Sequence, residues 1–217
     1  MKLIKLSLAA ALLATGILAA ETSEVGVSAN MAMTSNYVWR GMTQSDDSPA
    51  IQGGFDLDYK GAYAGVWASN INFGDAEASL EADFYVGYAN EISSFSYDVG
   101  YNQYTYPNDT DALNFGEAYA KLGYDFEVAS VGAAYYLGVE TDTFDAPDAW
   151  ELSVSAPLPM DFSVDATYGD YDEVGAYYLV GLNKSFGKFD FTIAYTAMDH
   201  DNADTEDNFV ATVGTSF

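Results

Sequence analysis

Alternation of apolar and polar side chains with a period of two residues runs through most of this chain and constrains its fold more than any other feature. Leu80, Phe84 and Val86 fall on one face of one such stretch. Glu81 and Asp83 fall on the other face, because successive side chains of a strand point to opposite sides. No helical period follows the first 20 residues, so the pattern predicts an all-β protein.

Twelve stretches with this alternation predict the strands of one antiparallel sheet. They lie at about 25–39, 51–59, 62–71, 80–88, 95–102, 114–124, 128–137, 150–156, 162–168, 174–184, 189–195 and 208–217. Each holds roughly 10 residues, which is the length that a tilted strand needs to cross a bilayer. We therefore expect a transmembrane antiparallel β-barrel of about 12 strands, with about ten or about fourteen strands as alternatives.

The predicted connections alternate between short and long. Short ones are expected at 60–61, 90–94, 125–127, 157–161 and 185–188, and longer ones at about 40–48, 72–78, 105–113, 138–148, 170–173 and 199–207. Short turns at one end and long loops at the other are typical of the outer-membrane barrels of Gram-negative bacteria. An even number of strands places both chain ends beside the short turns, on the periplasmic side.

The N-terminal residues 1–20 read as a cleaved signal peptide. Lys2 and Lys5 precede an apolar stretch at 6–18, and the small residues Ala19 and Ala20 follow it. This segment is too short and too interrupted to span a membrane as a helix. Residues 21–217 are then expected to form a single outer-membrane barrel.

The C-terminal strand has one apolar face and ends on an aromatic residue. Phe209, Ala211, Val213 and Phe217 share that face. This ending resembles the closing strand of bacterial outer-membrane barrels. It implies that the barrel-insertion machinery is a partner of this strand.

The two faces of the predicted strands differ strongly, with aliphatic and aromatic residues on one and small, hydroxylic or acidic residues on the other. A lipid-facing outside and a wet lumen explain that difference. The alternative is a secreted antiparallel sandwich or a lipocalin-like barrel with its apolar faces inward. Aromatic residues near strand ends fit membrane-interface girdles: Tyr37, Trp39, Trp67, Tyr88, Tyr104, Trp150 and Tyr168.

Residues 34–72 carry a resemblance to a known family. The motifs that carry it run from Ser35 to Gln44, from Pro49 to Asp56 and from Tyr63 to Ile71. Their family-specific residues are Tyr37, Trp39, Arg40, Gly41, Pro49, Gly53, Gly54 and Trp67. The segment resembles the TorF-type porin family, a proteobacterial outer-membrane family of unknown function. The resemblance implies an outer-membrane pore and supplies no catalytic residues.

The charge of the chain restricts its partners. With 33 acidic and 7 basic residues the formal net charge is −26, and nucleic acid binding needs a cationic surface. The absence of Cys excludes disulfides and thiolate metal sites. The predicted barrel makes outer-membrane lipid and lipopolysaccharide the expected surroundings, and the oligomeric state stays open.

Acidic residues dominate the polar face of the predicted strands. The lumen-lining candidates are Arg40, Asp56, Asp58, Glu81, Asp83, Asp98, Glu117, Lys121, Glu151, Asp165 and Asp190. Carboxylates around a water-filled path attract cations and repel anions. The alternative is a packed polar lumen in which Lys121 and tyrosines pair with these acids, or a lumen plugged by loops that fold inward.

Arg40 is the only Arg in the chain and is expected where the first strand meets the first long loop. It has two possible roles. It braces that loop against lumenal acids, or it contacts a solute at the pore mouth. A lone cation in an acidic barrel readily finds partners, which favours bracing.

The acidic segment 199–207 offers a candidate calcium site. Its oxygen ligands would be Asp199, Asp201, Asp204 and Glu206, and calcium takes six to eight oxygens. The segment lacks the turn glycine of an EF-hand, so a solvated acidic loop is the alternative. His200 is the only His and has no evident Ser partner, so we expect neither an enzyme nor a cofactor.

These features favour an outer-membrane channel for passive diffusion of small cationic or neutral solutes, with a preference for cations. The alternative is a non-conducting structural or adhesion barrel with acidic surface loops. Small side chains on the polar face slightly favour the channel, although glycine also eases strand curvature.

Overall fold

The computed structural model describes residues 25–74, 78–107, 113–139 and 146–217. The predicted signal peptide, residues 1–20, lies outside the described residues, so its cleavage stays a prediction.

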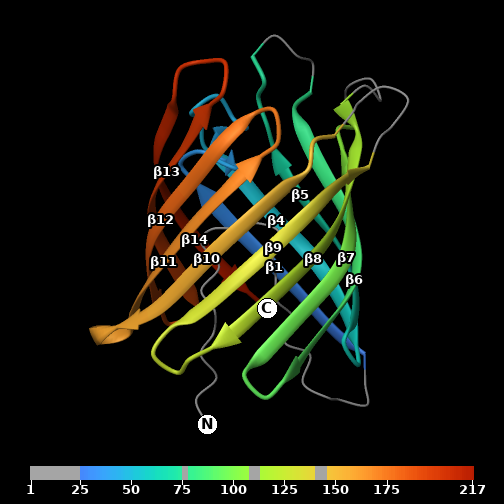
Figure 1. Ribbon diagram of the computed structural model, residues 1–217, viewed down its shortest axis with the longest axis vertical. Coiled ribbons are helices and arrows are strands. Elements are labelled where there is room, and N and C mark those ends of the chain that lie inside the picture. Colours follow the sequence, from blue (N-terminus) through green and yellow to red (C-terminus); the bar gives the residue numbers. More distant parts are fainter. Residues whose placement is uncertain (1–24, 75–77, 108–112, 140–145) are drawn as a thin grey trace.

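Twelve strands form one closed antiparallel barrel, which confirms the predicted fold. Figure 1 shows them tilted around a single interior. The strands are β1 (Gly26–Thr34), β4 (Ala50–Tyr59), β5 (Ala62–Asn70), β6 (Leu80–Ile92), β7 (Phe95–Thr105), β8 (Phe115–Asp125), β9 (Ser130–Val139), β10 (Ala149–Leu158), β11 (Phe162–Tyr171), β12 (Gly175–Phe186), β13 (Phe189–His200) and β14 (Glu206–Ser216). Consecutive strands pair all the way round.

The first and last strands close the barrel. Thr34 of β1 lies opposite Thr212 of β14, and Asn30 lies opposite Ser216. Beyond this ladder, the backbones of Ala29 and Phe217 exchange hydrogen bonds of 3.2 and 2.9 Å. Closure leaves no edge strand in this twelve-stranded sheet, which a sheet exposed to lipid requires.

The outer face of the barrel is apolar. Large hydrophobic side chains along the strands are solvent-exposed in the isolated chain, among them Phe55, Phe84, Leu152 and Ile193. Their strand neighbours Asp56 and Asp83 are buried inside. Apolar residues outside and acids inside are the reverse of a soluble barrel or sandwich, so that alternative is wrong.

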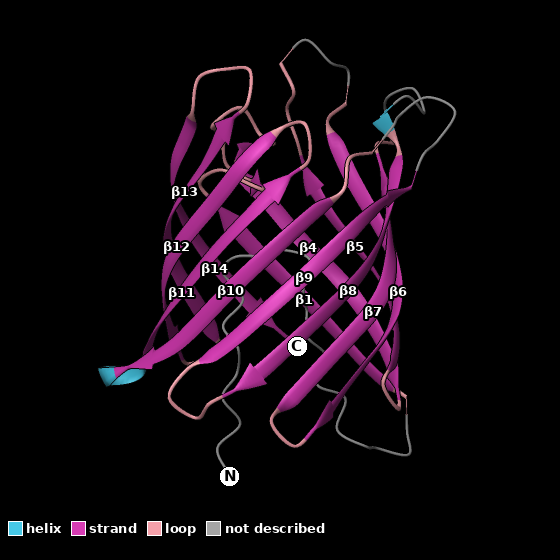
Figure 2. Ribbon diagram, viewed as in Figure 1, coloured by secondary structure: helices cyan, strands magenta, loops and turns pink. Residues whose placement is uncertain are grey.

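The two ends of the barrel differ. Figure 2 shows long loops at the upper end and tight connections at the lower end. Lys60 and Gly61, with φ of 50° and 90°, form one of these two-residue turns, as the twist of a hairpin favours. A short 3₁₀ turn, η2 (Pro159–Asp161), joins β10 to β11. Within the described ranges, no helix is long and apolar enough to cross a membrane.

The first strand is shorter than predicted, and this is the main difference in the fold. It ends at Thr34 rather than near residue 39, and a separate hairpin of β2 (Val38–Trp39) and β3 (Met42–Thr43) follows. Tyr37 and Trp39 fall in step with the apolar positions Met31 and Met33 of β1, so period alone does not reveal the break.

The girdle prediction is correspondingly wrong for some aromatics. Tyr37, Trp67 and Tyr104 are buried inside the barrel, because they belong to the inner face or to the first loop. Trp39 packs against buried interior residues. Tyr88, Trp150 and Tyr168 are exposed on the outer face, as a girdle requires.

Neighbouring positions on β10 allow the lipid face to be tested. Leu152 points outward with 54% of its surface exposed, whereas Ser153 points inward. We expect Leu152→Arg to lower the free energy of unfolding in phospholipid vesicles by roughly 2–4 kcal/mol, because charge is costly in the hydrocarbon region. Ser153→Arg is the matched control and should cost much less, since the arginine meets an acidic interior. Equal losses in denaturant titrations of the two variants would contradict the assignment of faces.

Candidate functional site

The first loop, residues 35–49, folds into the barrel and carries the candidate site at the tip of its hairpin. Arg40 and Gly41 form the two-residue turn between β2 and β3, with φ of 47° and 83°. Two consecutive positive φ values match the type I′ turn that closes tight hairpins. The turn aims the side chain of Arg40 at the opposite wall.

Trp39 contacts strands on different sides of the barrel. Its ring lies 5.8 Å from the ring of Tyr104 on β7, 6.2 Å from Phe115 on β8 and 5.5 Å from Tyr171 on β11. The same side chain packs against both buried clusters of the interior. The hairpin therefore fills the space between β7 and β8 on one side of the barrel and β11 on another.

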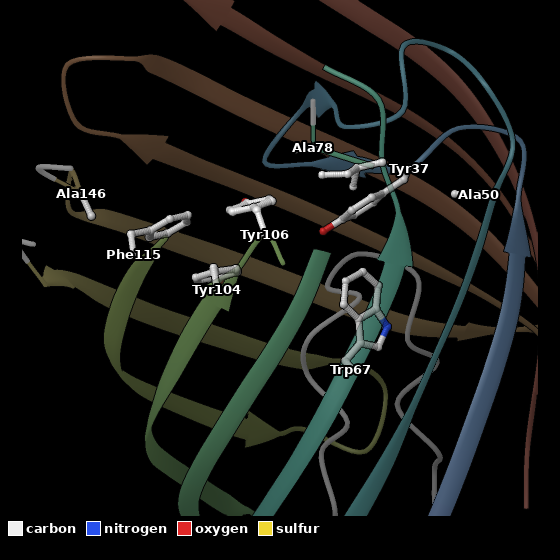
Figure 3. Close-up of a cluster of buried hydrophobic side chains, with 9 residues drawn as sticks. Tyr37, Ala50, Trp67, Ala78, Tyr104, Tyr106, Phe115 and Ala146 are labelled. Atoms are coloured by element: carbon white, nitrogen blue, oxygen red, sulfur yellow. The ribbon is translucent and has the colours of Figure 1, made fainter. Parts of the chain in front are cut away.

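Tyr37, near the start of the loop, packs against the wall. Its ring meets Trp67 edge-on at 5.4 Å, and its hydroxyl donates to Glu81 at 3.3 Å. Figure 3 shows Tyr37 beside Trp67, with Tyr104 and Tyr106 in the same interior cluster. Burial raises the pKa of the Tyr37 hydroxyl well above its ordinary value, and the nearby carboxylates add to the rise, so Tyr37 acts as a neutral donor.

Arg40 forms a buried two-point ion pair with Glu117 on β8. Its Nη1 lies 2.6 Å from Oε1, and its Nη2 lies 3.1 Å from Oε2. The side chains retain only 4% and 1% of their accessible surface. The hydroxyl of Tyr104 donates to the same carboxylate at 3.0 Å. This arrangement matches the predicted bracing role, and bidentate pairs of this kind are strong and directional.

A network of polar contacts anchors the rest of the loop. The backbone N–H of Thr43 donates to Glu206 at 2.5 Å, and its hydroxyl donates to Asn36 at 2.7 Å. Asn36 also donates to Asn208 at 3.0 Å, while Ser45 receives the backbone N–H of Tyr37 at 2.9 Å. Glu206 and Asn208 belong to β14, so the loop is tied to the closing strand as well as to β8.

Position 41 requires glycine for two reasons: its backbone has a positive φ, and it lies too close to β13 for a side chain. A Cβ there would lie 2.4 Å from the carbonyl oxygen of Ala197 and 2.8 Å from the amide nitrogen of Met198. Both atoms belong to β13. The turn therefore rests directly on the wall, and a side chain at this position would push it away.

Tyrosine hydroxyls serve most of the predicted lumenal acids. Asp98 accepts from Tyr63 at 2.6 Å, and Glu151 accepts from both Tyr136 and Tyr177 at 3.0 Å. Asp56 accepts from Tyr85. Tyr63 and Tyr119 also share a hydrogen bond. The interior thus combines acids with neutral donors, as the packed polar alternative expects.

The other predicted lumenal residues also lie on the inner face. Lys121 places its ammonium 4.5 Å from the ring centre of Tyr119. Asp165 accepts from Asn183 at 2.5 Å, and Asp190 accepts from Ser185. Asp58 faces Gly26 of β1. Glu81 and Asp83 are almost completely buried near the loop.

These positions divide the interior along the barrel axis. Near the long loops it is packed with buried side chains from the wall and the hairpin. Towards the short turns, Asp58, Lys121, Glu151 and Asp190 are half-buried or exposed. The first loop is therefore the narrow part of any path. The roles of the predicted residues in solute passage stay predictions.

The remaining family-motif residues lie at the end of the first loop and in the first half of β4. A Cβ at Gly53 would meet the carbonyl oxygen of Asn30 at 2.7 Å, and one at Gly54 would meet that of Val66 at 2.7 Å. Pro49 precedes the start of β4. These positions hold β1, β4 and β5 close together at the base of the loop.

The predicted calcium ligands do not gather into a site within the described part of the chain. There, no group of three or more His, Cys, Asp or Glu side chains is placed to hold a metal ion. Asp199 accepts from Thr205 at 2.9 Å. Glu206 instead holds the first loop through Thr43, and its other oxygen lies 4.0 Å from His200. Asp201 and Asp204 are exposed.

Sequence reasoning missed several residues of this site. Tyr136 and Tyr171, which face Arg40, were not singled out, and neither were Asn36 and Glu206 in their anchoring roles. The dipeptide Arg40-Gly41 was a usable signal, because a glycine in a two-residue turn between apolar residues marks a hairpin. The wall residues carried no such signal, since their meeting depends on the closure of the barrel.

A comparison with protein families finds a match. A family model described as a bacterial protein of unknown function (Gcw_chp) matches residues 18–217. A comparison with curated proteins finds no match.

Solved porins share the fold. The KdgM porin has a TM-score of 0.60 at 11% identity, covering 88% of this chain and 98% of its own. A KdgM structure in complex with disordered oligogalacturonate has a TM-score of 0.59 at 10% identity, with coverages of 88% and 97%. The NanC porin has a TM-score of 0.57 at 13% identity, with coverages of 88% and 99%. The fold is that of bacterial outer-membrane porins, which agrees with the predicted localisation in the outer membrane.

Substitution of Gly41 should unseat the loop without changing its charge. Gly41→Val adds a side chain where β13 leaves no space, so we expect faster protease cleavage within residues 35–49 of the folded barrel. Gly187→Ala is the matched control. Gly187 also has a positive φ, of 64°, but a Cβ there meets nothing within 4 Å. Equal protection of the loop in wild type and Gly41→Val would refute the packing of the turn against β13.

A double-mutant cycle should reveal the coupling between Arg40 and Glu117. Removing either partner leaves a buried charge, so Arg40→Ala and Glu117→Ala should each reduce the free energy of opening the first loop by about 3–5 kcal/mol. The double variant should lose little more than either single one. Hydrogen exchange at the Thr43 amide measures this opening. Lys184→Ala, at the opposite end of the barrel, should leave it unchanged. Additive losses would show that the two residues act independently.

Proposed function

We propose that this chain, which belongs to the Gcw_chp family of bacterial proteins of unknown function, is an outer-membrane channel that passes small solutes and prefers cations. The observation that carries the proposal is the acidic inner face of a closed barrel. This face carries the nine acids that the sequence predicts to line the lumen, and the cations beside them are Lys121 and Arg40. The low-dielectric wall focuses the electric field of these carboxylates into the lumen. The focused field raises the local concentration of cations.

Hydrogen bonding to tyrosines supports this preference. A neutral hydroxyl donor orients a carboxylate but leaves its negative charge in place. Asp98 and Glu151 are held in this way, with Tyr63 and Tyr136 among their donors. The interior therefore keeps a negative potential even though most of its acids have partners.

The shared fold does not imply that this chain and KdgM pass the same solute. Oligogalacturonate, which the KdgM complex contains, is a polyanion and would be repelled by an acidic lumen. We therefore propose a different solute class here, small cations or neutral molecules. The resemblance of residues 34–72 to TorF-type porins supports the porin assignment, and membership in that narrower group is part of the proposal.

The seated first loop supports a gated channel rather than a permanently open one. Trp39 and Arg40 lie across the interior and contact several walls. Opening then requires the hairpin to withdraw or shift, which separates Arg40 from Glu117. No catalytic function is proposed, and recognition of Phe217 by the insertion machinery stays a prediction.

The same packing favours a second function. A loop that fills the interior and never moves would make this a non-conducting structural or adhesion barrel with acidic surface loops. The buried clusters around Trp39 and Met198 are the observation in its favour.

Single-channel recording with a salt gradient across a planar bilayer separates the two functions. We expect brief, cation-selective openings from the refolded mature chain and larger, more frequent openings from Gly41→Val. Asp98→Asn combined with Glu151→Gln should lower the cation selectivity, because two carboxylates leave the lumen. Glu127→Gln removes a charge from an exposed short turn and should leave selectivity unchanged.

Silence in both the wild type and Gly41→Val would reject the channel in favour of the structural barrel, provided that heat-dependent gel mobility shows both to be folded. Anion selectivity in either would reject the proposed role of the lumenal acids.

A further inference from the structure

We propose that the cage around Arg40 is a binding site for small molecules that bear a guanidinium group, which enter by taking the place of the arginine on the first loop. The inference rests on the proposed channel function and names the class of solute that opens it. In the structure, the loop supplies its own copy of that ligand.

The cage surrounds a planar cation on several sides. The guanidinium carbon of Arg40 lies 4.3 Å from the ring centre of Trp39, 4.7 Å from that of Tyr136 and 4.8 Å from that of Tyr171. Cations are attracted to aromatic faces within about 6 Å. Glu117 adds two parallel hydrogen bonds at the edge of the group. Faces and edge of the guanidinium are thus recognised separately.

Most of the cage belongs to the wall rather than to the loop. Glu117, Tyr136 and Tyr171 lie on β8, β9 and β11, and Tyr104 on β7 holds the carboxylate in place. When the hairpin withdraws, Arg40 and Trp39 leave together. A desolvated carboxylate and two aromatic faces remain. An unpaired buried charge is unfavourable, so the vacated cage favours a free cation of the same shape.

The geometry distinguishes guanidinium from ammonium. Two parallel N–H groups match the two oxygens of Glu117, whereas an ammonium is a compact point charge that cannot bridge both in a plane. Lys121, the other cation of the interior, illustrates the contrast. Its ammonium lies against the rings of Tyr119 and Tyr136, at 4.5 and 5.5 Å from their centres.

A second carboxylate lies one step farther along the barrel. Glu151 is opposite Ala134 of β9, whereas Tyr136 is opposite Ala149, so Glu151 is one inward position nearer the short turns. Tyr136 touches both sites, since it faces Arg40 and donates to Glu151. A cation that leaves the cage towards the periplasm therefore meets another carboxylate directly.

Calorimetric titration of the folded, detergent-solubilised barrel tests the site without requiring conduction. Methylguanidinium is titrated into Arg40→Ala, and methylammonium serves as the comparison ligand. We expect methylguanidinium to bind at least about tenfold more tightly than methylammonium, because only it forms the bidentate pair. Wild type should bind it at least about tenfold more weakly than Arg40→Ala, since Arg40 competes for the cage.

Controls separate the cage from general cation binding. Arg40→Ala combined with Glu117→Gln should lose at least about tenfold in affinity. Lys184→Ala, which removes a cation 4.2 Å from the ring centre of Phe162, should gain no binding. If Arg40→Ala does not fold, Gly41→Val, which withdraws Arg40 with the hairpin, takes its place. Absence of binding to the folded variant, or equal binding of both cations, would overturn the proposal.

The same variant in a planar bilayer distinguishes this inference from the channel function. Selective binding with no current would keep the cage and reject the channel. Current without selective binding would keep the channel and reject the cage. Blockade of the Arg40→Ala current by methylguanidinium but not by methylammonium would support both.

Discussion

The closure of β1 on β14 is the constraint on which the rest of the structure depends. A sheet in lipid has no water to satisfy its backbone polar groups, so every strand needs two neighbours. Pairing of Thr34 with Thr212, extended by the hydrogen bonds between Ala29 and Phe217, removes the last edge. Once the sheet closes, alternate side chains have no choice of side. Apolar residues meet lipid, and the acids on the opposite face of the strands meet one shared interior.

A barrel of this size poses a packing problem that its wall does not solve alone. Twelve strands enclose an interior wider than that of small barrels filled by their own side chains. The first loop fills part of it with Tyr37, Trp39 and Arg40. Arg40 also brings a positive charge to Glu117, which would otherwise be buried unpaired. One hairpin thus fills the space and balances the charge of Glu117. Both effects are lost when the hairpin moves.

The fold alone does not identify a solute. The acidic interior is the feature from which we propose one. KdgM and NanC share the barrel at identities of 11% and 13%, a level at which fold is retained while the lining of the lumen is free to change. The Arg40 cage has the form of a ligand site occupied by the protein itself. In the proposed mechanism, a solute that reproduces the planar cation displaces Arg40 from the cage, which would link recognition to opening.

The period-two pattern of side chains was sufficient to predict the strand number, the face that meets lipid and the succession of short and long connections. Each of these follows from the local pattern and from the cost of exposing polar groups to lipid. It also placed the carboxylates of Asp56, Glu117 and Glu151 on the inner face. It did not separate β2 from β1, since Tyr37 and Trp39 fall in step with the apolar positions Met31 and Met33 of the preceding strand. Nor did it bring Arg40 to Glu117, 77 residues away, or to Tyr136 and Tyr171. Those meetings depend on the curvature of a closed sheet and on a turn at Arg40 and Gly41 that rests against β13, and such long-range contacts have no signature in the neighbouring residues.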